Sequence, residues 1–259
     1  MRRLFAGASS SAVSRWTASR KRDRVTALTG IPASDWQRIA QAFPDLPPDP
    51  GPRAAANREK LHRLASRALA TGRWKTRLDG EAPDPAPAIY VSAHIGALQA
   101  LRYALRARGI PAASVIGRFN LDRTIPARTD PIFDRRFPME FPHALASTHP
   151  HRLRSALKRG SLIVAADMPE RESRPAAILG GRVALDLRPF RLGRAARVAC
   201  RAAFLTLPPE GWTLTISAPL PTGDDAAADA FGRIFAGVAA KAPLDMDGLV
   251  YRSLTESAR

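Results

Sequence analysis

The chain has 259 residues, which is long enough for one large α/β domain with a sizeable core. Its 40 Lys and Arg against 23 Asp and Glu give a formal net charge of +17, and the resulting field attracts anionic partners. The single cysteine, Cys200, excludes an internal disulfide and a zinc site built from several cysteines. We find no run of about 18 apolar residues and no apolar signal-peptide core, so the pattern predicts no transmembrane helix.

The first residues of the chain form a distinctly basic segment. In residues 1–25, seven Lys and Arg face a single acid, Asp23, with serines and small residues between them. This composition suits a basic arm on an anionic membrane surface or an organellar transit peptide, and equally a solvated, disordered tail. We therefore divide the chain into this arm and an α/β domain over 26–259. Elsewhere the positive charge is spread out, without a basic cluster interleaved with aromatics, which disfavours nucleic acid as a partner.

Helical and strand patterns alternate along the rest of the chain. Apolar spacing and proline or glycine breaks predict two helices before the first buried strand, over 34–43 and 53–71. The segment from 117 to 141 has charges and prolines but little periodicity, and a long loop of this kind is often functional. This alternation predicts an α/β fold, one mixed β-sheet flanked by helices. The remaining predicted elements are strands 89–93, 113–116, 161–166, 183–187, 203–207 and 212–217 and helices 98–105, 148–157, 191–201 and 225–241.

His94 lies where the first buried strand ends and a helix begins. The apolar run 89–93 precedes it, and Leu98, Leu101 and Leu105 follow at helical spacing. In α/β proteins the carboxyl end of a strand is the usual place for a ligand or a catalytic group. The positive end of the helix dipole keeps an imidazole neutral there and able to accept a proton. A structural histidine that caps the helix is the alternative interpretation.

Several short motifs follow one another in a recognisable order over about residues 55 to 220. Together they resemble the lysophospholipid acyltransferase superfamily and, within it, the branch of lipid A late acyltransferases and the mycobacterial phosphatidylinositol mannoside acyltransferase. That branch has a His, four residues and an acid at the head of a helix, then an Arg and an Asn after the next strand. The similar residues here are His94-Ile95-Gly96-Ala97-Leu98-Gln99, Arg118, Asn120, Arg128, Leu157-Lys158-Arg159-Gly160, the strand that ends at Asp167, Leu179-Gly180-Gly181, and the helix and strand that end at Pro208.

The resemblance implies an acyltransferase-like fold and an O-acyltransferase. Such an enzyme moves a fatty acyl chain from acyl-CoA or acyl carrier protein to a hydroxyl of a lipid or glycolipid, as in lipid A biosynthesis. It would need no metal and no cofactor beyond the acyl donor. Because the pattern lacks the family's N-terminal membrane helix, we expect a peripheral protein on an anionic membrane, at the cytoplasmic side of the inner membrane.

The resemblance also assigns roles to individual residues. His94 would be the general base that takes the proton of the acceptor hydroxyl. Arg118 would stabilise the oxyanion or bind the phosphates of the donor, with Asn120 and Arg128 as further substrate-binding residues. The acids that follow the strand 161–166 are candidates for the orientation of the base or for the acceptor pocket; they are Asp167 and Glu170.

Gln99 departs from the family at the position of the acid. Its amide oxygen can accept a hydrogen bond from an imidazole, but it brings no negative charge to stabilise imidazolium. Three interpretations stay open. The chain is a slow transferase oriented by Gln99, a transferase that borrows Asp167, Glu170 or Glu172 as its acid, or a non-catalytic lipid- or acyl-binding homologue.

Overall fold

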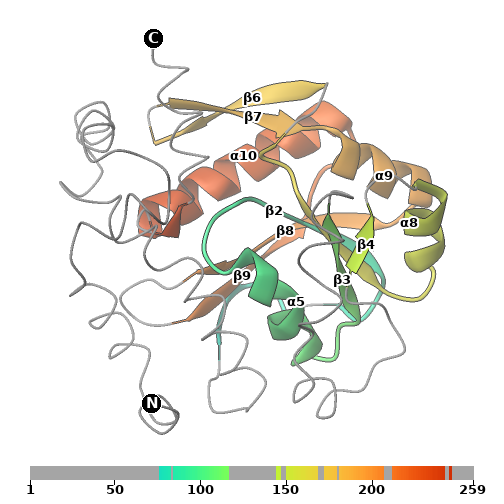
Figure 1. Cartoon of the computed structure of the whole chain (residues 1–259). Helices are drawn as coiled ribbons and strands as arrows, with labels where there is room; N and C mark the ends of the chain where they lie inside the picture. Colours follow the sequence, from blue (N-terminus) through green and yellow to red (C-terminus); the bar gives the residue numbers. More distant parts are fainter. Residues whose placement is uncertain are drawn as a thin grey trace, which may run out of the picture.

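The computed structural model (Figure 1) describes residues 76–82, 84–116, 144–146, 150–168, 172–179, 181–206, 212–242 and 245–246. These residues form one α/β domain around a seven-stranded sheet with the strand order β1-β9-β8-β2-β5-β3-β4. The pair β8 and β9 is antiparallel and every other neighbouring pair is parallel, so the sheet is mixed, as predicted. The strands are β1 (Arg77–Gly80), β2 (Ala88–Ser92), β3 (Ala112–Ile116), β4 (Ala144–Ala146), β5 (Ser161–Ala165), β8 (Ala199–Thr206) and β9 (Thr213–Pro219).

Helix α5 (Leu98–Arg106) covers one face of the sheet (Figure 1). Its Leu101 and Leu105 are fully buried in one apolar cluster with Tyr90, Ile163 and Leu205, which come from β2, β5 and β8. Because successive side chains of a strand point to opposite faces, the neighbours of these residues along each strand lie in the other core cluster. The three central strands are therefore buried on both faces, which explains their nearly continuous apolar sequences.

Helices α9 (Arg188–Ala196) and α10 (Asp224–Lys241) cover the opposite face of the sheet. There Phe204 of β8 stacks against Phe231 and Phe235 of α10, with ring centroids 5.7 and 5.8 Å apart. Burying each of these aromatic side chains contributes about 1.5–3 kcal/mol. Helix α8 (Pro150–Ala156) contacts β5 and α9 and buries Leu153 on the same side.

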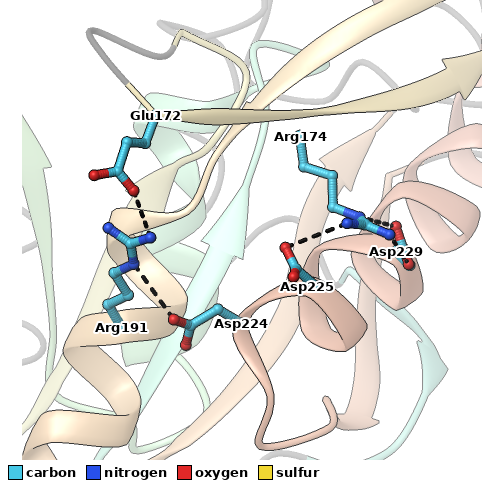
Figure 2. Close-up of polar contacts among 6 residues, drawn as sticks. All are labelled: Glu172, Arg174, Arg191, Asp224, Asp225 and Asp229. Carbon is cyan, nitrogen blue, oxygen red and sulfur yellow. Dashed lines mark hydrogen bonds and ion pairs between the residues drawn. The ribbon is translucent and has the colours of Figure 1, made fainter.

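A two-stranded antiparallel hairpin, β6 (Ser173–Ile178) and β7 (Gly181–Asp186), packs on α10 away from the sheet (Figure 1). Gly232 permits this close approach, because a Cβ there would lie 2.8 Å from the Cβ of Ala176. Ion pairs at the rim reinforce the contact: Arg174 binds Asp229 at 2.5 and 2.9 Å (Figure 2). The hairpin thus forms an outer layer above the helices.

The predicted strands 89–93, 113–116, 161–166, 183–187, 203–207 and 212–217 all correspond to strands of the structure. The helix predicted over 191–201 is partly wrong, because α9 ends at Ala196 and β8 begins at Ala199. Arg197 adopts a left-handed φ of 57° that ends the helix. The sequence patterns missed β1, β4 and β6. The predicted arm 1–25, the helices 34–43 and 53–71 and the loop 117–141 lie outside the described residues.

Candidate active site

The candidate site lies at the carboxyl ends of β2 and β5, which are parallel neighbours. The chain that leaves β2 runs through α5 to β3, on the far side of β5. The chain that leaves β5 runs through the hairpin and α9 to β8, on the far side of β2. The two connections run in opposite directions along the sheet and place helices on opposite faces. The carboxyl ends of β2 and β5 therefore form a topological switch point. Ligands of open α/β sheets bind in crevices at such points.

His94 follows β2 and Asp167 follows β5, and their side chains meet across this switch point. His94 Nδ1 lies 2.8 Å from Asp167 Oδ1, and the backbone N–H of His94 donates to Asp167 Oδ2 at 2.7 Å. The side chain of Asp167 is 0% exposed and that of His94 is 22% exposed. Because a carboxylate only accepts, this contact assigns the imidazole proton to Nδ1 and leaves the lone pair, and therefore the basic site, on Nε2.

The turn that carries His94 is fixed through its backbone. Gly96 adopts a left-handed φ of 62°, and a Cβ at this position would clash with the carbonyl oxygen of Leu205, so glycine is required there. The three amides after His94 each donate to a different segment of the described chain. These hydrogen bonds run from Ile95 to Ala93 (2.8 Å), from Gly96 to Asp245 (2.8 Å) and from Ala97 to Leu205 (2.7 Å).

Asp167 is held just as firmly through the preceding residue. The Ala166 N–H donates to the Ser92 carbonyl at 2.8 Å, and the Asp186 N–H donates to the Ala166 carbonyl at 2.6 Å. The Asp186 carboxylate in turn accepts from the Arg188 backbone N–H at 2.9 Å and from its Nε at 2.7 Å. The end of β5 is therefore braced by β2 on one side and by the end of β7 on the other.

The structure brings together two of the residues predicted from the sequence, His94 and Asp167. Gln99 lies in the first turn of α5, and its side chain is outside the described part of the chain. Glu172 instead forms an ion pair with Arg191, which lowers the pKa of its carboxyl (Figure 2). The other predicted site residues, Arg118, Asn120, Arg128 and Glu170, lie outside the described residues.

Sequence analysis missed the residues that support the pair. Asp186 and Asp245 act from segments far along the chain, and no periodicity or motif marks them. One available signal did point to Asp167. It directly follows a buried strand, and the carboxyl ends of parallel strands share an edge of the sheet.

Cys200 takes no part in this chemistry. It lies on β8, where its Sγ is 3.7 Å from the Pro189 carbonyl of α9, and burial raises the pKa of its thiol to about 12. The thiol therefore stays protonated near neutral pH and is not a nucleophile. Within the described ranges, no three or more His, Cys, Asp or Glu side chains are grouped as metal ligands, and no helix has the length and apolarity to cross a bilayer.

Comparison with known proteins adds no assignment. No protein-family model matches the chain, and no curated protein is significantly similar to it in sequence. The site is therefore defined by its own geometry: a buried carboxylate that orients a partly exposed histidine at the switch point of a mixed α/β sheet.

Proposed function

We propose that the chain is an O-acyltransferase that moves a fatty acyl chain from acyl-CoA or acyl carrier protein to a hydroxyl of a lipid or glycolipid. The observation that carries the proposal is the His94–Asp167 pair at the carboxyl ends of β2 and β5. A neutral imidazole whose Nδ1–H donates a hydrogen bond to a carboxylate is the arrangement that general-base activation of a hydroxyl requires.

In the proposed reaction, Nε2 of His94 takes the hydroxyl proton as the oxygen attacks the thioester carbonyl. The carbon–sulfur bond then breaks, and the thiolate leaves with the proton returned by the imidazolium. The products are an ester and a free thiol, and no oxidant or reductant is consumed. Asp167 stabilises the imidazolium that exists between the two proton transfers and holds the ring in the productive tautomer.

Asp167 supplies the charge that Gln99 lacks. A carboxylate in contact with Nδ1 favours the protonated ring, whereas an amide only orients it. With the side chain of Asp167 fully buried, little solvent screens this interaction. The pair therefore favours a transferase with a displaced acid over a slow transferase oriented by Gln99 alone.

Three further observations favour an acyl donor. The net charge of +17 attracts the phosphates of CoA or of a carrier-bound pantetheine and an acidic carrier protein. Met168, directly after Asp167, is 51% exposed and is the only large apolar side chain that is exposed among the described residues. A methionine is an adaptable contact for an alkyl chain. The order of motifs that resembles the lysophospholipid acyltransferases selects acyl transfer from the reactions that a His–Asp pair performs.

The activity test measures thiol release from acyl-CoA and acyl carrier protein, with and without lipid hydroxyl acceptors. His94→Ala should lower acceptor-dependent thiol release by about 10³-fold or more, because the general base is lost. His151→Ala, a change to an exposed histidine on α8, is the matched control and should leave the rate unchanged. Equal inertness of wild type and His94→Ala, with acyl ligands still bound, would make the chain a non-catalytic acyl-binding protein. Thiol release without an acylated acceptor would make it a thioesterase.

We also propose that the protein acts as a peripheral protein at the cytoplasmic side of the inner membrane. Residues 1–25 are basic, and the described stretch 150–160 adds Arg152, Arg154, Lys158 and Arg159 without an acid. Binding to anionic vesicles should weaken in high salt, because charge attraction is screened within about 8 Å at physiological ionic strength. Removal of residues 1–25 should reduce this binding. If wild type binds no anionic vesicle, the peripheral assignment fails.

A further inference from the structure

After α10 ends at Lys241, the chain returns to the candidate site. The Asp245 carbonyl accepts the Gly96 N–H at 2.8 Å, and Met246 forms an antiparallel bridge with Ile95. Met246 and Ile95 are each 1% exposed and lie in one core cluster. The last described residues of the chain therefore pack directly against the turn that carries His94.

Within the described part of the chain, two other contacts join this one in holding the turn from outside. Asp167 binds the His94 backbone N–H, Leu205 of β8 binds the Ala97 N–H, and Asp245 binds the Gly96 N–H between them. A left-handed Gly96 is a conformation that a flexible turn occupies only part of the time. Without the contact to 245–246, the Gly96 N–H loses its hydrogen bond to the Asp245 carbonyl, and Ile95 loses its bridge to Met246. The ring and the amide of His94 both bind Asp167, so a rotation of this turn disturbs both hydrogen bonds.

We infer that Asp245 and Met246 complete the site as positioning residues, which hold His94 in register with Asp167. In consequence the His94–Asp167 pair reaches its final geometry only when the chain has folded through residue 246. In this role they act on the rate through the position of His94. The kinetic part of this inference rests on the proposed acyl transfer, whereas its structural part does not.

The experiment compares two core truncations of similar size. Met246→Ala removes the buried side chain of the residue that bridges Ile95 in the turn, and Leu153→Ala removes a buried side chain of the same core cluster on α8. Both variants should lose stability. Only Met246→Ala should lower kcat, by about 10- to 100-fold with KM for the acyl donor unchanged, because a small misplacement of a catalytic group costs this much. Met246→Leu, which conserves volume, should restore kcat.

A second readout needs no substrate. In ¹⁵N-histidine NMR spectra of the full chain near neutral pH, the wild-type His94 ring should show the tautomer with the proton on Nδ1. Met246→Ala should show a mixture of tautomers and a titration midpoint at lower pH, because a histidine that loses a carboxylate partner binds its proton less tightly. Leu153→Ala should match wild type in both respects.

The outcomes separate this inference from the proposed function. If wild type transfers no acyl chain but the ring responds to Met246→Ala as described, acyl transfer fails and the positioning role stands. If Met246→Ala and Leu153→Ala leave the tautomer and kcat equally unchanged, Met246 only fills the core and the inference is overturned.

Discussion

Two acids in the connection between β5 and β6, Asp167 and Glu172, have different surroundings. Asp167 is fully buried, and its two oxygens accept from the ring and the backbone of His94. Glu172, five residues later, is 60% exposed and binds Arg191, a side chain that is itself 43% exposed (Figure 2). The difference shows that the position of the backbone at the strand end, together with burial, determines which acid pairs with His94.

The surroundings also set what each pair contributes. Removing one member of a buried, hydrogen-bonded pair leaves a polar group without its partner, which is costly. An exposed ion pair holds two long side chains in one geometry and is screened by water and salt, so it contributes little. We therefore expect changes at Asp167 to alter the chemistry of the site and changes at Glu172 to be nearly silent.

The sharpest test compares Asp167→Asn with Glu172→Gln, which remove the same charge from the same connection. Asp167→Asn should lower kcat by about 10³- to 10⁴-fold, because an amide brings no charge to stabilise imidazolium. With its oxygen on the His94 backbone N–H, its NH₂ group would face Nδ1 and favour the tautomer protonated on Nε2. Glu172→Gln should leave kcat within about twofold of wild type, since its pair is exposed. Initial rates of thiol release with saturating donor and acceptor measure both. Similar losses in the two variants would place the catalytic acid elsewhere.

The second test concerns the stability of the turn that carries His94. Gly96→Ala should destabilise the fold by at least about 2 kcal/mol, because Ala resists a left-handed φ and its Cβ meets the Leu205 carbonyl. Gly237→Ala on α10 is the matched control, since its Cβ would meet nothing within 4 Å. That change should stabilise the helix by about 0.5–1 kcal/mol. Urea unfolding monitored by circular dichroism gives both values, and equal midpoints would show that the turn is not rigid.

The sequence predicted the central strands, and the position of His94 between a strand and a helix, for a physical reason. A strand buried on both faces must be apolar throughout, and the change to helical spacing after His94 marks the strand end directly. The same pattern locates Asp167 at the end of β5 but does not say that β5 lies beside β2. Sheet order depends on contacts between distant segments, and these leave no periodic trace in the chain.

Short or weakly apolar elements escaped prediction for related reasons. The edge strand β1 has the sequence RLDG and carries mostly polar residues. Strand β6 lies on α10 with alternating exposure. It also contains a proline, which in a sequence pattern indicates a turn instead of a strand. The end of α9 depends on the left-handed Arg197, a residue that no rule favours there. The role of Asp245 rests on a backbone carbonyl, which any residue provides.

The third test replaces Gln99 with the acid found in the family that the chain resembles. With Asp167 already on Nδ1, Gln99→Glu should change kcat by no more than about threefold in either direction, because the ring already has its carboxylate partner. The informative experiment introduces Gln99→Glu into the Asp167→Asn variant. If Gln99→Glu restores activity there, the two positions exchange the same role. A large gain in the wild-type background would instead show that Asp167 supplies no effective charge to His94.

The smallest effect belongs to the ion pairs that hold the hairpin at its rim. The hydrogen bond from Arg191 lowers the pKa of Glu172, and the hydrogen bond from Arg174 lowers the pKa of Asp229. A carboxyl whose pKa is lower in the folded state stabilises the fold above its unfolded pKa, and this stabilisation is lost as the pH falls through the folded pKa. The hairpin contact should therefore weaken only below about pH 4, the unfolded range of Asp and Glu.

Hydrogen exchange with protection factors corrected for intrinsic rates tests this expectation. Amides of β6 and β7 should lose protection modestly between neutral pH and this acidic range, while amides of β2 keep theirs. High salt near neutral pH should reproduce part of the loss, because the pairs are exposed and screened. Glu172→Gln should remove part of the acid dependence without changing protection in β2. If β2 loses protection together with the hairpin, the two regions unfold as one unit, and the contrast between a rigid site and a weakly held outer layer is wrong.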